Sequence, residues 1–269
     1  LGHLPADARI YCQPTALVER PHGLDGRVAR IGGSMLWFTA WHITVRGHGE
    51  ALVPVEAMAH WMAGLPEPLA ERAAAQTANV ARQHGALELK GRRVPLGEPQ
   101  LMGILNCTPD SFSDGGQHSD AEAAVAAGVD MASAGAAIID VGGESTRPGA
   151  KLVWEGDEIA RTVPVVERLA RAGIAVSIDT RKAAVMEAAL AAGAAMVNDV
   201  SALCYDERAA EVVGAARCPV VLMHAPSQSS DPHANAGYDD VLFDVFDWLE
   251  AAIARAARAG IAREAILID

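Results

Sequence analysis

Aromatic residues are scarce in this chain, at 4% of its 269 residues, and cysteines and positive charges are also few. The four cysteines, at positions 12, 107, 204 and 218, form no Cys-x-x-Cys pair and have no regular spacing. Neither a disulfide framework nor a zinc knuckle is therefore indicated, and a reducing compartment fits best. The chain has only 22 basic residues but 34 acidic ones. The resulting formal net charge of -12 argues against nucleic acid or an anionic membrane as the main partner.

Long apolar runs and a recognisable signal segment are missing as well. The first residues, Leu-Gly-His-Leu-Pro-Ala-Asp, contain no basic region and no apolar core, and charges interrupt the alanine-rich stretch 121–141. A hydrophobic fraction of 51% with 21% charged residues is typical of a globular protein. We therefore expect a soluble, cytoplasmic protein that does not bind membranes. Because the chain starts without Met and stops at the end of an apolar run, we also expect it to be part of a longer protein.

Residues 1–86 are expected to form a small α+β extension, whose function the sequence does not indicate. The predicted elements are a hairpin of residues 35–45 and 51–55 and helices over 55–62 and 67–84. A second hairpin, of residues 87–90 and 94–96, is predicted at the start of the following domain, 87–269. Gly85 is expected at the C′ position of the longer helix. The first 35 residues have little periodicity and allow no assignment.

After Pro99 one unit repeats: an alanine-rich helix, a glycine, and a short apolar strand that ends in a carboxylate or an amide. The predicted strands are 101–105, 137–140, 175–179, 196–199, 220–223 and 266–269. Glycine after a helix permits the left-handed conformation that ends it, and continuous apolar strands are typical of a parallel sheet covered on both faces. The repeat therefore predicts parallel strands that alternate with helices.

This alternation predicts an α/β fold of the (β/α)8 TIM-barrel type over residues 87–269, incomplete, with about six of the eight strands. Polar residues follow the strands, at the edge where such barrels carry their active sites: Asn106, Asp140, Asp179, Asn198, Asp199, His224 and Asp269. A doubly wound open sheet is the alternative. The absence of a Gly-x-Gly-x-x-Gly motif after the first strand weakens it.

Two loops carry a distinctive sequence. Asn106-Cys-Thr-Pro-Asp-Ser-Phe-Ser-Asp-Gly-Gly116 and Ile139-Asp-Val-Gly-Gly-Glu-Ser-Thr-Arg-Pro-Gly149 closely resemble the two signatures of bacterial dihydropteroate synthases. Further matches, in order, are Ser177-Ile-Asp-Thr180, Val197-Asn-Asp199, Leu222-Met-His224, Tyr238-Asp-Asp-Val241 and Leu267-Ile-Asp269. The resemblance covers residues 87–269.

The resemblance implies a transferase of folate biosynthesis that joins 4-aminobenzoate to (7,8-dihydropterin-6-yl)methyl diphosphate and releases diphosphate. Asp179, Asn198 and Asp269 would line the pterin pocket, with Met223 against the ring. The residue types suit this role, because a carboxylate is the natural bidentate acceptor for the adjacent N–H groups of a pterin. Asp179 would also stabilise the cationic pterin methylene left when diphosphate departs.

The leaving group requires the opposite polarity. Asn106 and Asp114 are hard oxygen ligands for an expected Mg²⁺ on the diphosphate, and Thr146 and Arg147 offer a hydroxyl and a guanidinium to its oxygens. We expect the loop around Phe112 to act as a lid. Its ring, with Pro148, would close over the aminobenzoate and exclude the water that could capture the cation.

Other polar residues are assigned more ordinary roles. We expect Asp140 to brace the following loop, Cys107 to be a small buried apolar residue, and Arg181 with Lys182 to start a helix. His224 either lines the barrel mouth or is a structural histidine, and the sequence favours neither. His42 and His48 flank a turn and lack further metal ligands.

Two alternatives differ in function. A methyltetrahydrofolate-dependent methyltransferase shares the pterin-binding logic but lacks both signature loops, and an inactive homologue could serve as a pterin-binding module. The chain departs from the family at Ala225-Pro226, where another methionine is common. The family also leads us to expect a Ser-x-Arg-Lys segment and an Arg-x-His pair beyond Asp269 and a homodimer for the full-length protein. These 269 residues alone are expected to be inactive and poorly stable, because the edges of the sheet at its first and sixth strands would stay unpaired.

Overall fold

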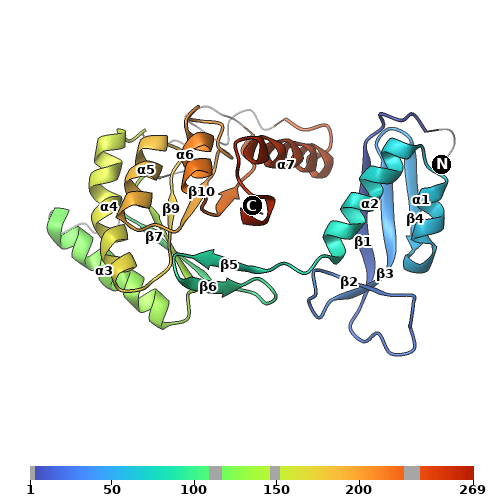
Figure 1. Ribbon diagram of the computed structural model, residues 1–269, viewed down its shortest axis with the longest axis horizontal. Coiled ribbons are helices and arrows are strands. Elements are labelled where there is room, and N and C mark those ends of the chain that lie inside the picture. Colours follow the sequence, from blue (N-terminus) through green and yellow to red (C-terminus); the bar gives the residue numbers. More distant parts are fainter. Residues whose placement is uncertain (1–3, 109–116, 146–151, 227–236) are drawn as a thin grey trace. The chain divides into compact units, whose positions relative to one another are not determined.

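The computed structural model describes residues 4–108, 117–145, 152–226 and 237–269 (Figure 1). The chain divides into two compact units. The first consists of Leu1–Gly85 with Leu96–Glu98, and the second of Ala86–Pro95 with Pro99–Asp269. Across the described ranges, no helix combines the length and the apolarity that crossing a membrane requires.

The first unit is an antiparallel sheet with two helices. Its elements are β1 (Ile10–Val18), β2 (Ala29–Arg30), β3 (Trp37–Val45), β4 (Gly49–Pro54), the 3-10 turn η1 (Val55–Ala57), α1 (Met58–Ala63) and α2 (Glu67–Ala81). Strand β3 is central, since it pairs with β1 and also with both β2 and β4. The predicted hairpin around residues 46–49 is therefore confirmed.

The core of this unit is built on β3, in which Phe38, Ala40, Trp41, Ile43 and Val45 are buried. Leu69 and Ala73 of α2 belong to the same core. Phe38 and Trp41 pack edge to face with ring centroids 4.7 Å apart. Gln76 of α2 joins the helix to β1, because its amide accepts from the Cys12 N–H at 2.8 Å and donates to the Ile10 carbonyl at 2.9 Å. Helix α2 ends earlier than predicted: Arg82 already has extended backbone (ψ 127°), so the expected C′ role of Gly85 is wrong.

The second unit contains six parallel strands: β7 (Met102–Asn106), β8 (Ile138–Gly142), β9 (Val176–Asp179), β10 (Met196–Asp199), β11 (Val220–Leu222) and β12 (Ile266–Ile268). Their spatial order is the order of the sequence, from β7 to β12. In a doubly wound sheet the order of the strands reverses near the middle of the sheet, whereas a TIM barrel keeps its strands in sequential order. All six predicted strands are confirmed, and the sheet they form is not closed into a barrel.

Helices connect these strands and follow one another along the sheet (Figure 1). They are α3 (Gln117–Ser133), α4 (Glu155–Arg171), α5 (Ala183–Ala192), α6 (Ala209–Ala216) and α7 (Val241–Arg258), with a 3-10 turn η2 (Arg263–Ala265) before β12. The predicted glycines after α3, α4, α5 and α7 all have positive φ: 111°, 77°, 122° and 89° at positions 135, 173, 193 and 260. These four helices thus end where the sequence indicates.

The core of the second unit lies between the strands and these helices. Ile139, Ile178 and Val197 of neighbouring strands are fully buried, and Val165 and Leu169 of α4 pack against them. All five residues of β8 are buried, as is typical of a strand whose two faces are both covered.

The second predicted hairpin is also present, as β5 (Ala86–Leu89) and β6 (Arg92–Pro95). Its basic residues contact the ends of two barrel helices. Lys90 Nζ donates to the Leu190 carbonyl at 2.8 Å, and Arg92 donates to the Gly173 carbonyl at 3.1 Å. Both carbonyls belong to helix C-termini, where cations are favourable.

Candidate active site

Four residues at the carboxyl ends of neighbouring strands lie in one row across the sheet. The register pairs Asn106 of β7 with Gly142 of β8, Gly142 with Asp179 of β9, and Asp179 with Asn198 of β10. Side chains in one register row point to the same face of a sheet. Two of the predicted pterin residues, Asp179 and Asn198, are therefore brought together as neighbours.

Two adjacent glycines of the second signature leave space for side chains of the site. A β-carbon at Gly142 would lie 3.2 Å from Oδ2 of Asp179, and one at Gly143 would lie 2.7 Å from Cγ2 of Thr162 on α4. Only a hydrogen fits at either position without displacing a neighbour. The glycine pair thus allows the Asp179 carboxylate to lean over β8 and lets the chain turn closely past α4.

The electrostatic environment of Asp179 disfavours its charge. The poor solvation of its carboxyl group, together with the nearby Asp140 carboxylate, raises the pKa of Asp179 well above its ordinary value. The ionised form of such a carboxyl group is strongly stabilised when a cation or a row of N–H donors approaches it. A raised pKa in a strand-end carboxylate is also a common mark of a functional site.

Asp140 is expected from the sequence to brace the following loop, but its side chain contacts a residue of the site instead. Asn198 Nδ2 donates to Asp140 Oδ2 at 2.8 Å, across the intervening strand β9. Burial raises the pKa of Asp140, and the polar side chains of Ser177 and Asn198 beside it partly offset the change. The expectation of a loop brace is therefore wrong, because Asp140 is buried in the middle of β8 and its side chain reaches Asn198 across β9.

Asp199, next to Asn198, has a structural role. Its carboxylate accepts from the N–H and hydroxyl of Ser201, both at 2.7 Å, and from the Leu203 N–H at 3.0 Å. These bonds hold a turn in which Ala202 and Leu203 both have positive φ, a conformation that costs energy in residues other than glycine. Burial raises the pKa of Asp199 to about 6.

The last two strands contribute three residues that the sequence singled out. Met223 and His224 follow β11, and Asp269 follows β12 as an exposed residue whose carbonyl accepts from the His224 N–H at 3.2 Å. The His224 ring packs edge to face on Trp248 of α7, with centroids 4.9 Å apart. Burial lowers the pKa of His224. The histidine ring thus packs on α7, as the structural alternative predicts.

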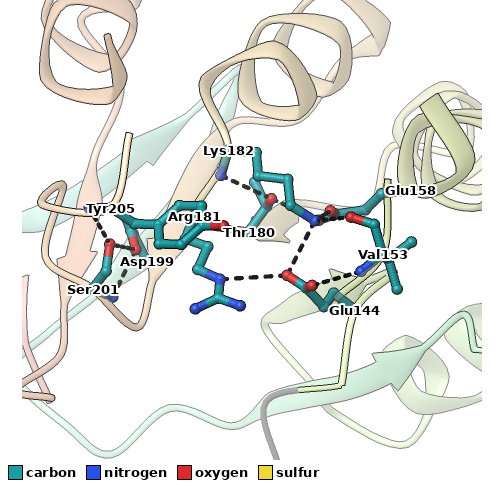
Figure 2. Close-up of polar contacts among 9 residues, drawn as sticks. All are labelled: Glu144, Val153, Glu158, Thr180, Arg181, Lys182, Asp199, Ser201 and Tyr205. Atoms are coloured by element: carbon teal, nitrogen blue, oxygen red, sulfur yellow. Dashed lines mark hydrogen bonds and ion pairs between the residues drawn. The ribbon is translucent and has the colours of Figure 1, made fainter. Parts of the chain in front are cut away.

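A buried charge network stands beside the site (Figure 2). Lys182 Nζ lies between two carboxylates, 3.1 Å from Glu144 Oε2 and 2.6 Å from Glu158 Oε2. Arg181 lies 3.4 Å from Glu144 Oε2, with its guanidinium 4.2 Å from the centre of the Tyr205 ring. Because all four charged side chains are buried, each charge depends on its partners.

The network joins three parts of the barrel. Glu144 belongs to the second signature and accepts from the Val153 N–H at 2.9 Å, while Lys182 donates to the Val153 carbonyl at 2.7 Å. Thr180 donates to Glu158 at 2.6 Å. Lys182 is the N-cap residue of α5, so the predicted helix start is confirmed. The pairing of its side chain was not foreseen.

Five predicted site residues, Phe112, Asp114, Thr146, Arg147 and Pro148, lie outside the described residues. Asn106 is exposed at the end of β7. Among the residues that the structure describes, no three His, Cys, Asp or Glu side chains gather where they could hold a metal ion. Cys107 is buried, and burial raises its pKa to about 12, which agrees with the expected apolar role.

Comparison with known proteins identifies the second unit. The family described as "Pterin binding enzyme" matches residues 102–269. Dihydropteroate synthase of Bacillus subtilis is 42% identical over 170 residues, which are 63% of this chain and 57% of that protein. The Escherichia coli K12 enzyme is 43% identical over 181 residues, which cover 67% of this chain and 64% of the relative.

Solved structures give the same result. The Xanthomonas albilineans dihydropteroate synthase with 4-aminobenzoic acid is 47% identical, with a TM-score of 0.64, over 70% of this chain and 66% of that one. A complex of this enzyme with 7,8-dihydropteroate has a TM-score of 0.60 at 45% identity, over 68% and 64% of the two chains. The chain thus spans less than two thirds of the length of these relatives.

Proposed function

Because the chain belongs to the pterin-binding enzyme family, we propose that it acts as a dihydropteroate synthase, joining 4-aminobenzoate to (7,8-dihydropterin-6-yl)methyl diphosphate with release of diphosphate. The observation that carries the proposal is the pairing of Asp179 and Asn198 in one register row at the carboxyl ends of β9 and β10. A carboxylate beside an amide is the arrangement that an edge of pterin N–H donors requires.

Asp179 has the central role in this proposal. Its carboxylate would accept two N–H groups of the pterin, and Asn198 and Asp269 would complete the polar contacts while Met223 packs on the ring. When the C–O bond to diphosphate breaks, positive charge develops on the pterin methylene. A poorly solvated carboxylate stabilises that charge more than it stabilises the neutral substrate, and this difference accelerates the reaction.

The diphosphate end is proposed to use the two signature loops. Asn106 and Asp114 would hold Mg²⁺, which would neutralise charge on the leaving diphosphate, and Thr146 and Arg147 would bind its oxygens. The support comes from the donor set, because amide and carboxylate oxygens are the ligands that Mg²⁺ prefers. Phe112 and Pro148 would cover the aminobenzoate ring and exclude water.

A diphosphate-release assay tests this function. The purified full-length protein is supplied with the pterin diphosphate and Mg²⁺, with and without 4-aminobenzoate, and 7,8-dihydropteroate is measured by chromatography. We expect diphosphate and dihydropteroate in equal amounts, and dihydropteroate only when the arylamine is present. Binding of the pterin without turnover would indicate an inactive homologue, and methyl transfer from methyltetrahydrofolate would indicate the related class of transferases.

A further inference from the structure

Asp140 is a buried carboxylate to which the proposed reaction gives no role. It is 4% exposed on the central part of β8, where the register places it beside Ser177 of β9. Its Oδ2 accepts from Asn198 Nδ2 at 2.8 Å. Its Oδ1 and the Ser177 hydroxyl are buried, and neither has a hydrogen-bond partner among the residues that the structure describes. A buried acceptor has few ways to be satisfied, so the bond from Asn198 matters.

The bond decides how the Asn198 side chain is presented. An asparagine amide has a donor end and an acceptor end, and either can face a ligand if the side chain turns by half a rotation about its last bond. An ionised carboxylate can only accept, so Asp140 holds the NH₂ end of Asn198. The carbonyl Oδ1 is then the end that remains for a ligand, next to the Asp179 carboxylate in the same register row.

We propose that Asp140 is a positioning residue that locks the Asn198 amide with its carbonyl oxygen toward the pterin. The site then offers acceptors from both Asp179 and Asn198, and it selects a heterocycle that presents N–H donors to both. A heterocycle with an acceptor opposite Asn198 would place that acceptor against the Asn198 carbonyl oxygen. Neither atom could then form a hydrogen bond, and such a heterocycle would be rejected because an unpaired buried polar group is costly. The part that concerns the pterin rests on the proposed function, whereas the orientation of Asn198 does not.

The orientation is tested first, by NMR of the side-chain amides. The Asn198 signal is identified by its loss in Asn198→Asp. We expect at least one Asn198 Nδ2 proton of the unmodified protein to exchange slowly with solvent, and its signal to move and its exchange to accelerate in Asp140→Ala. Asp140→Asn, which keeps the size of the side chain, should have a smaller effect. Asp130→Asn is the matched control, because it makes the same change at an exposed position of α3 and should leave the signal unchanged.

Ligand selection is tested next, by calorimetry with 6-hydroxymethyl-7,8-dihydropterin and by steady-state kinetics. We expect Asp140→Ala to lower the affinity for this pterin by about tenfold or more, which is the range for losing one hydrogen bond to a fixed acceptor. The KM for the pterin diphosphate should rise, while the KM for 4-aminobenzoate and the kcat change less. Asp140→Asn should lie between Asp140→Ala and the unmodified protein.

Two results would overturn the inference: an Asn198 signal that is the same with and without the Asp140 carboxylate, or an unchanged pterin affinity in both variants. A purely structural role of Asp140 would instead lower stability and affect both substrates equally. If the unmodified protein binds no pterin, the proposed function fails, and the NMR experiment still decides whether Asp140 orients Asn198.

Discussion

Gly142 and Asp179 lie side by side on β8 and β9, so close that a β-carbon at Gly142 would come within 3.5 Å of the β-carbon of Asp179 and nearer still to its carboxylate. The β8 residue beside Asp179 therefore has no side chain, which leaves room for the Asp179 carboxylate. This relationship links the second signature to the carboxylate on which the proposed chemistry depends.

Gly142→Ala should reduce activity without unfolding the protein. The added methyl group displaces the Asp179 carboxylate by a few tenths of an ångström or more, and small misplacements of catalytic groups cost roughly tenfold to a hundredfold in rate. The measurement is kcat/KM for the pterin diphosphate, with circular dichroism to confirm the fold. Gly97→Ala is the control, since a β-carbon there meets nothing within 4 Å. Equal kcat/KM values for the two variants would contradict the steric argument.

Lys182→Met should strongly destabilise the protein, because it leaves the buried carboxylates of Glu144 and Glu158 without their shared ammonium group. Removing one partner of a buried ion pair costs about 3–5 kcal/mol in the free energy of unfolding. Urea denaturation followed by circular dichroism measures the loss.

The control for this variant is Arg171→Met, which breaks the exposed pair between Arg171 and Glu167, 2.6 Å apart on α4. Surface pairs contribute less than about 1 kcal/mol, so the control should unfold at nearly the same urea concentration as the unmodified protein. Similar losses in both variants would show that the buried network contributes no more than a surface pair.

The pH dependence of stability should include a contribution from Asp199, whose pKa rises from 3.8 to about 6 on folding. The folded state then binds this proton more tightly than the unfolded state. The contribution is fully favourable below pH 3.8 and is lost as the pH rises through 6, with a total of about 3 kcal/mol. Asp199→Asn removes this titration but also weakens the bonds to Ser201 and Leu203. The variant should therefore be less stable, and its free energy of unfolding should change less between pH 4 and 7. A variant with the same slope as the unmodified protein would contradict the assignment.

Local patterns were sufficient to predict the barrel-type sheet. Six apolar runs, each preceded by a glycine or a turn and followed by a polar residue, gave all six strands and placed Asp179 and Asn198 at one edge. The first strand of the chain, β1, was not predicted, because Pro14 and the positive φ of Ala16 interrupt its pattern and its partner β3 lies far along the sequence. Pairing with β3 compensates for that weak local preference.

The charge network and the Asp140–Asn198 bond could not be predicted for a related reason. Glu144 pairs with Arg181 across 37 residues, and Asp140 with Asn198 across 58. Nothing in the neighbouring sequence specifies these contacts, which arise only when strand register and helix packing bring the side chains together. The glycine pair at 142 and 143, by contrast, was visible in the signature, and its steric reason follows from the structure.

The most direct test of the proposed function is diphosphate release by Asp179→Asn in the full-length protein, measured beside the unmodified full-length protein with the pterin diphosphate and 4-aminobenzoate. Asparagine keeps the size of the side chain and removes the charge that would stabilise the pterin cation. The account predicts a fall in rate of at least about a hundredfold, with an unchanged circular dichroism spectrum. A rate close to that of the unmodified protein would contradict the central role of Asp179.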